Sequence, residues 1–165
     1  MIAAPLALIY IFFATLIGAG LYDIKTYTIP NIIPIVVMAL FILAGLVVPL
    51  SLTEWGWQIL AGTFAFSLGF GLFVLGLMGG GDVKLYGAIG LWVLPSKILM
   101  LTAFITVTGA LLALTVLGFK IIKVRRGGNS VKNWKQAYFA SRRTRIPYGP
   151  AITIGTILFW ISTAV

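Results

Sequence analysis

The chain contains no cysteine and no histidine among its 165 residues, and only three of its residues are acidic. Without cysteine and histidine there are no disulfides, no thiol nucleophiles, no Ser-His-Asp triads and no metal sites built on thiolate or imidazole. We therefore expect neither a metal nor another cofactor. The side chains left for catalysis are those of Asp, Glu, Ser, Thr, Tyr, Lys and Arg.

Charge of either sign is scarce. Charged residues make up 9% of the chain and hydrophobic residues 61%, whereas soluble domains carry about 25% charged residues. This composition predicts a membrane protein, and no polar stretch is long enough to fold separately, so we expect one domain over residues 1–165. The net charge of +9 comes from Lys and Arg that cluster between the apolar segments. That clustering is typical of membrane orientation and argues against nucleic-acid binding.

The apolar runs predict an all-α polytopic protein with about six transmembrane helices. Five runs are long enough to cross a bilayer, and a sixth, at about 83–95, is shorter. The longer runs cover about 3–22, 31–49, 56–77, 98–118 and 146–164. No Lys or Arg precedes the apolar part of the first run, so we expect an uncleaved helix there instead of a leader that is removed.

The basic residues predict how these helices are oriented. Nine of the twelve lie in a loop at about 119–145, which the positive-inside rule places in the cytoplasm. Six crossings then put Lys25 and Lys84 on the cytoplasmic side and leave only Lys97 outside, with both termini outside. Within the loop, the helical spacing of residues 131, 134 and 138 fits a short amphipathic helix on the anionic inner surface, or equally a loop that only sets orientation.

Two of the three acids share the expected cytoplasmic boundary. Asp23 ends the first helix and Asp82 follows the third, whereas Glu54 lies in a short external loop, where we expect it to be solvated. Two carboxylates a few ångströms apart share one proton. The ionised carboxylate can accept a proton from water, and the protonated one can polarise a peptide carbonyl. The sequence permits such a pair and leaves open which aspartate starts ionised.

Each aspartate also has a structural interpretation. Asp23 could be an acid at a helix end that pairs with Lys25, and Asp82 could cap the fourth helix. Lys84, taken alone, could be a charge that only orients the helix in the membrane. These interpretations stay open at the level of the residues.

Three consecutive glycines, Gly79, Gly80 and Gly81, precede Asp82. Each weakens a helix by about 1 kcal/mol relative to alanine, but together they would let a substrate backbone approach the carboxylate closely or hydrogen-bond to the exposed main chain. A phosphate-binding loop is the competing interpretation. It is excluded because no Gly-Lys-Ser/Thr follows and Asp82 would repel phosphate.

Three motifs resemble those of the type IV prepilin leader peptidases, a family of membrane aspartyl peptidases. Residues 79–84, GGGDVK, match the GxGD motif in the form with a following apolar residue and lysine. Asp23, six residues before Ile29-Pro30-Asn31, matches the first-aspartate motif, and residues 146–152, IPYGPAI, resemble the segment that opens the last helix. The motifs occur in the family's order over nearly the whole chain.

The resemblance implies cleavage of prepilin-like precursors, just after a short basic leader, at the cytoplasmic face of the inner membrane. By matching position, Asp23 and Asp82 would be the catalytic pair. The resemblance also implies that the three glycines, together with Pro147, Tyr148 and Gly149, form substrate-binding or active-site backbone. It implies supporting roles for Pro30, Asn31 and Lys84. The expected partners are the precursor proteins and membrane lipid.

The chain is most similar to the small peptidases of tight-adherence (Flp) pilus systems, and archaeal preflagellin or prepilin peptidases carry similar motifs. Larger bifunctional relatives have a cysteine-containing cytoplasmic segment and also methylate the new N-terminus. This chain has no cysteine and no such insertion, so methyltransferase activity is not implied.

Two other classes of function compete with a peptidase. A proton- or cation-coupled transporter would hold its coupling acids near the bilayer midplane, whereas here both aspartates are expected at one boundary. A non-catalytic assembly subunit would explain the helices but not the glycines beside Asp82. The sequence therefore favours an aspartic endopeptidase.

Overall fold

The computed structural model describes residues 4–126 and 147–164, which form six α-helices and one short 3-10 helix. The elements are α1 (Leu6–Thr26), α2 (Ile32–Val47), α3 (Leu52–Val74), α4 (Gly80–Gly90), η1 (Pro95–Lys97), α5 (Ile98–Arg126) and α7 (Gly149–Ala164). The described residues include no strand. The predicted all-α fold class is confirmed.

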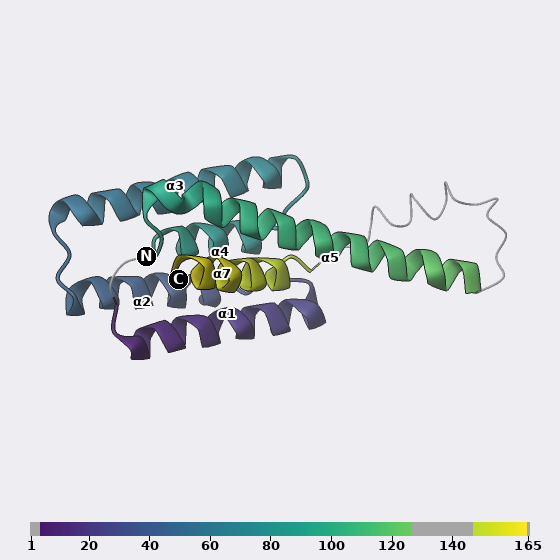
Figure 1. Cartoon of the computed structure of the whole chain (residues 1–165), viewed down its shortest axis with the longest axis horizontal. Coiled ribbons are helices and arrows are strands. Elements are labelled where there is room, and N and C mark those ends of the chain that lie inside the picture. Colours follow the sequence, from purple (N-terminus) through teal and green to yellow (C-terminus); the bar gives the residue numbers. More distant parts are fainter. Residues whose placement is uncertain (1–3, 127–146, 165) are drawn as a thin grey trace.

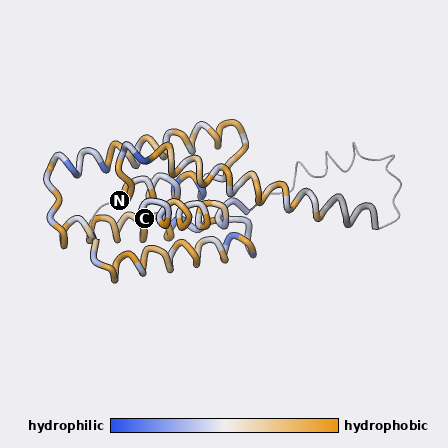
Figure 2. The backbone as a smooth tube through the Cα atoms, in the orientation of Figure 1, coloured by the Kyte–Doolittle hydropathy of each residue, from blue (hydrophilic) through white to orange (hydrophobic). Residues whose placement is uncertain are grey.

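The helices differ in whether they are long enough to cross a membrane. Three stretches, Leu6–Thr26, Leu52–Val74 and Pro95–Val116, are long and apolar enough, while Ile32–Val47 and Gly149–Thr163 are apolar but shorter. The 11 residues of α4 extend only about 16 Å, roughly half of a hydrocarbon core. Apolar residues cover most of α1, α2 and α3 (Figure 2). These features make the chain a membrane protein.

The short helix α4 lies inside the bundle, between α2 and α3 (Figure 1). Eight of its residues are buried, and glycines bring its backbone close to α3. A Cβ added at Gly90 would lie 2.7 Å from the Cβ of Ala65, and one at Gly87 would lie 2.9 Å from the Cβ of Phe66. Small residues at such contacts are the usual means of close helix packing in membranes. On the other side of the bundle, α7 packs against α1 and α5.

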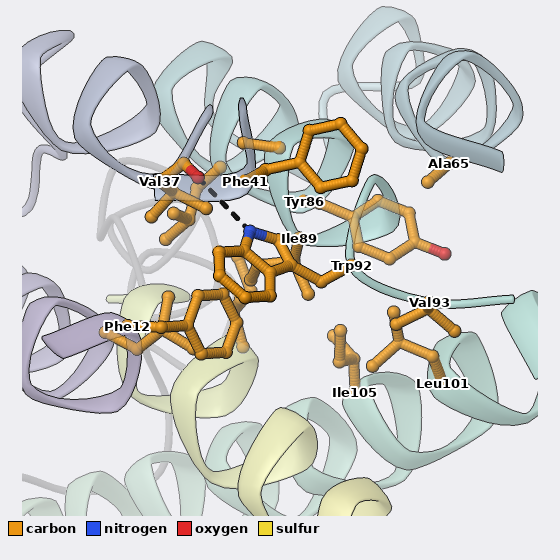
Figure 3. Close-up of a cluster of buried hydrophobic side chains, with 14 of the residues drawn as sticks. Phe12, Val37, Phe41, Ala65, Tyr86, Ile89, Trp92, Val93, Leu101 and Ile105 are labelled. Carbon is orange, nitrogen blue, oxygen red and sulfur yellow. Dashed lines mark hydrogen bonds between the residues drawn. The ribbon is translucent and has the colours of Figure 1, made fainter. Parts of the chain in front are cut away.

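Trp92, just after α4, lies at the centre of the aromatic core (Figure 3). Its ring centroid is 4.6 Å from that of Phe12 and 6.2 Å from that of Phe41, and its indole nitrogen donates to the carbonyl of Val37 at 3.1 Å. The side-chain amide of Gln58, oriented so that its nitrogen faces the carbonyl oxygens of residues 91 and 93, donates to both at 2.9 Å. Large side chains with satisfied polar atoms therefore fix the end of α4 far from Asp82.

Helices α3 and α5 both extend beyond their predicted ends. We expected Glu54 in a loop, but α3 starts at Leu52 because Ser51 and Glu54 form a capping box. The Ser51 hydroxyl accepts from the Glu54 amide at 3.3 Å, and the Glu54 carboxylate accepts from the Ser51 amide at 2.7 Å. Helix α5 continues to Arg126 instead of ending near residue 118, because Lys and Arg are good helix formers and favour a helix C-terminus.

Pro30 lies just before α2, which starts at Ile32, and its carbonyl accepts a hydrogen bond from the amide of Ile33 at 3.1 Å. Most of the expected basic loop at 119–145, including the amphipathic pattern at 131, 134 and 138, lies outside the described residues.

Candidate active site

Helix α1 ends, and helices α4 and α7 begin, at the same end of the bundle (Figure 1). Asp23 lies in the last turn of α1 and Asp82 in the first turn of α4. Both side chains are buried, with exposed fractions of 3% and 8%. The fold therefore brings the only two aspartates of the chain to one end of the protein interior.

Asp23 is positioned by the start of α7. One oxygen of its carboxylate, Oδ2, accepts a hydrogen bond from the amide of Gly149 at 2.8 Å. A Cβ added at Gly149 would lie 2.8 Å from the Cβ of Asp23, so only glycine lets the two backbones approach this closely. No ion pair joins Asp23 to Lys25 in the part of the chain that the structure describes, so Asp23 contacts the protein interior instead of a neighbouring lysine.

Asp82 is held more loosely. Its Oδ2 accepts from the amide of Gly79 at 3.1 Å, and its buried Oδ1 has no hydrogen-bond partner among the described residues. Asp82 lies outside the three candidate spans. Burial, together with the negative charge of Asp23, raises the pKa of Asp82 to about 7. The two carboxylates are thus close enough to influence each other's ionisation.

The three glycines before Asp82 have different surroundings. A Cβ added at Gly81 would lie 2.7 Å from the carbonyl oxygen of Ile29, in the loop that follows Asp23. One added at Gly80 would meet only a ring carbon of Phe73 at 3.7 Å, an ordinary contact. We expected all three glycines to open space for a substrate; Gly81 instead makes room for the chain's own backbone. This contact connects the segment after one aspartate to the segment before the other.

Pro147 and Tyr148 lie directly before α7. Burial and the charge of Asp82 raise the pKa of the Tyr148 hydroxyl, which therefore stays protonated near neutral pH. A Cβ added at Gly109 of α5 would lie 2.7 Å from that hydroxyl oxygen. Tyr148 thus lies within electrostatic range of Asp82 and is held against α5.

Lys84 and Asn31 contact each other but not the aspartates. The Lys84 ammonium donates to the Asn31 side-chain oxygen at 2.8 Å, and both residues are exposed. Lys84 follows Asp82 by two residues, a spacing that places the two side chains on opposite faces of a helix. Pro30, which is half-buried, precedes Asn31 in the same loop.

Sequence reasoning missed three residues that hold the site together. Thr153 donates to the carbonyl of Leu16 at 2.8 Å and fastens α7 to α1, and a Cβ added at Gly20 would lie 3.0 Å from the Thr153 hydroxyl. Gly109 makes room for Tyr148. Single small residues inside apolar helices are the usual sign of close helix contacts in membranes, and that sign was available for Gly20 and Gly109.

The described residues contain no group of three acidic side chains that would hold a metal ion. What they offer is a pair of buried carboxylates beside backbone amides. One carboxyl can carry a proton while the other is ionised, and such a pair can activate water.

Comparison with known proteins identifies the family. A model of the type IV leader peptidase family matches residues 10–114. This range is more than half of the chain and includes both aspartates and the three glycines, but not the segment 147–149. Neither the curated proteins nor the solved structures yield a significant match. On the strength of the family match, the chain belongs to the type IV leader peptidase family.

Proposed function

We propose that this protein is an aspartic endopeptidase that removes the short basic leader from type IV prepilin-like precursors. Membership of a peptidase family supports the reaction class. The observation that carries the aspartic mechanism is the joint burial of Asp23 and Asp82, from helices distant in sequence, at one end of the bundle. A transporter is less favoured because both carboxylates lie at helix ends and not near mid-helix.

The surroundings of the two carboxylates support a different role for each. Asp82 has a pKa of about 7 and an oxygen without a partner among the described residues, so it carries the shared proton near neutral pH. Asp23, whose Oδ2 accepts from the amide of Gly149, is then the ionised member. Asp23 removes a proton from water as the water oxygen attacks the scissile carbonyl carbon, while Asp82 donates its proton to the carbonyl oxygen.

Collapse of the resulting tetrahedral intermediate breaks the carbon–nitrogen bond. The leaving nitrogen takes the proton that Asp23 received from water, and the hydroxyl formed on the former carbonyl oxygen returns a proton to Asp82 as the new carboxyl group forms. Both aspartates return to their starting states. The mechanism needs no nucleophile other than water.

The same end of the bundle is the one we assign to the cytoplasm. Helix α5 projects beyond the other helices at this end (Figure 1), and its last turns contain Lys120, Lys123, Arg125 and Arg126. Basic residues beside a span favour the cytoplasmic side. A basic leader approaching a chain with a net charge of +9 meets like charges, so we assign the local attraction to the two aspartates. Methyltransferase activity is not part of the proposal, because the chain lacks cysteine.

The proposal is tested by cleavage of a model prepilin in membranes that contain Asp23→Asn or Asp82→Asn. Asparagine keeps the size of the side chain but neither ionises nor carries the shared proton. We expect each variant to lose at least about a hundredfold in rate, the usual contribution of a general acid or base. Equal membrane insertion of all variants is checked first.

Glu54→Gln is the matched control. It removes the third acid of the chain, which is exposed and caps α3, and glutamine still fits a capping box. Its cleavage rate should equal that of the wild type. Cleavage by either aspartate variant at near the wild-type rate would contradict the two-carboxylate mechanism.

A further inference from the structure

A groove runs between α2 and α3, with α4 as its floor. It encloses about 550 Å³. Helices α2 and α3 both pack on α4, and they meet at one end of the groove, where the rings of Phe41 and Trp55 lie 5.2 Å apart. The groove is lined by residues of all three helices and by one residue beside each of α2 and α4. These are Asn31, Pro34, Ile35, Met38, Ile59, Gly62, Thr63, Phe66, Lys84, Gly87, Ala88 and Leu91.

The groove lies on the face of α4 opposite Asp82. Three residues of α4 and the residue that follows it, Lys84, Gly87, Ala88 and Leu91, have the spacing of one helix face. Asp82 is two residues from Lys84 and faces away from it. In the middle of the floor, Gly87 and Ala88 are small residues. The groove is therefore a site distinct from the two carboxylates.

The polarity of the groove is uneven along its length. The walls are apolar side chains, several of them exposed, such as Ile35 at 52% and Ile59 at 55%. The one cation in the lining, Lys84, lies at the end where α2 and α4 begin, hydrogen-bonded to Asn31. An apolar groove with a cation at one end matches a phospholipid, whose acyl chain is apolar and whose phosphate is anionic.

Among the residues that the structure describes, no carboxylate contacts Lys84. Of the three acids, Asp23 accepts from Gly149, Asp82 accepts from Gly79 on the other face of α4, and Glu54 caps α3. An ammonium has three N–H donors, and the structure gives that of Lys84 one partner among the described residues, Asn31. Donors of Lys84 and the amide of Asn31 are thus available to phosphate oxygens.

We propose that this groove binds one anionic phospholipid, with an acyl chain along α2, α3 and α4 and the headgroup phosphate on Lys84 and Asn31. The lipid would connect the start of α2 to the start of α4. This inference does not depend on the proposed peptidase mechanism, because it concerns a different face of α4 and is tested without a substrate.

The test uses the full-length protein, delipidated in neutral detergent, with phosphatidylglycerol or phosphatidylcholine of identical acyl chains. Bound lipid is counted by native mass spectrometry, and the thermal unfolding midpoint is measured. We expect one retained phosphatidylglycerol and a midpoint raised by about 3 °C or more, as for a ligand that binds only the folded state. Phosphatidylcholine should give a clearly smaller shift.

Three variants separate the groove from general attraction between lipid and a basic protein. Lys84→Gln should abolish the preference for phosphatidylglycerol. Lys25→Gln removes an exposed lysine at the same end of the bundle, outside the groove lining, and should keep the preference. Thr63→Phe fills the groove from an exposed wall position and should reduce lipid retention while leaving the charge of Lys84 in place.

Several outcomes would overturn the proposal. Equal shifts with the two lipids, or equal losses in Lys84→Gln and Lys25→Gln, would show that the groove does not select an anionic headgroup. Full retention in Thr63→Phe would show that the acyl chain lies elsewhere. A dimer in the native spectra that Thr63→Phe abolishes would assign the groove to a second copy of the chain. None of these outcomes bears on cleavage by the aspartates.

Discussion

The two ends of α4 are held by different kinds of contact. At its start, the contacts are made by backbone: the amide of Gly79 meets Asp82, that of Gly149 meets Asp23, and Gly81 lies against Ile29. Beyond its far end, the contacts are made by large side chains around Trp92. One helix therefore joins a region of small residues and buried charge to a region of aromatic packing.

The difference also extends to how polar atoms are satisfied. At the aromatic end, the indole nitrogen of Trp92 reaches Val37 and the amide of Gln58 reaches two carbonyls. At the aspartate end, Oδ1 of Asp82 is buried without a partner among the described residues, which costs folding free energy. The aromatic packing stabilises the bundle, whereas the aspartate end carries a cost in stability, as the proposed function would require of a catalytic site.

Of the changes that test this difference between the two ends, Trp92→Ala should have the largest effect on stability. Removing a fully buried ring that contacts Phe12 and Phe41 leaves a cavity, and the expected loss is about 3–5 kcal/mol in the free energy of unfolding. The measurement is thermal or denaturant unfolding in detergent. Trp57→Ala, at a position that is 54% exposed, is the control and should change stability far less. A stable Trp92→Ala variant would mean that the aromatic cluster does not hold the bundle together.

At the start of α4, substitutions of Gly81 and Gly80 test whether contact between backbones positions the two aspartates. In Gly81→Ala the new methyl group would lie 2.7 Å from the carbonyl oxygen of Ile29, and overpacking of this kind costs about 1–3 kcal/mol. Since Ile29 belongs to the loop after Asp23, we expect the cleavage rate to fall at least about tenfold in protein that still folds. The assay is cleavage of a model prepilin at matched amounts of folded enzyme.

Gly80→Ala is the matched control for this substitution. The added methyl group meets only Phe73 at 3.7 Å, and alanine stabilises a helix by about 1 kcal/mol relative to glycine. We expect near wild-type cleavage and equal or higher stability. If Gly80→Ala lost as much activity as Gly81→Ala, the glycines would serve the substrate directly, as the sequence alone suggested.

Much of this fold could be predicted from the sequence because apolar runs and basic clusters report membrane helices directly. The helix ends were less accurate: the cap formed by Ser51 and Glu54 was overlooked, so α3 was expected to start several residues late. The apolar runs in the sequence also do not indicate which helices contact each other. The contact of Asp23 with Gly149 joins residues 126 positions apart, and no local pattern contains it.

The same limit applies to individual glycines. A run of three looks uniform in sequence, yet Gly81 faces backbone while Gly80 faces nearly open space. Gly109 gave only the general signal of a small residue in an apolar helix, and its partner Tyr148 lies on a different segment. Such pairings depend on how helices rotate against each other, which is fixed by the whole core and not by either segment.

The pH dependence of cleavage tests the aspartate end without any substitution. If Asp82 must donate a proton, the active fraction is half at its pKa of about 7 and falls tenfold for each pH unit above it. A raised pKa on an acid means that the active, protonated form persists to higher pH than usual and is lost as the pH rises. The lower limb of the profile belongs to the other member of the pair.

Tyr148→Phe should leave the upper limb in place, because the pKa of Tyr148 is raised from an already basic value. A rate that instead increases between pH 7 and 9 would mean that Asp82 acts as the base, and the roles of the two aspartates would be exchanged.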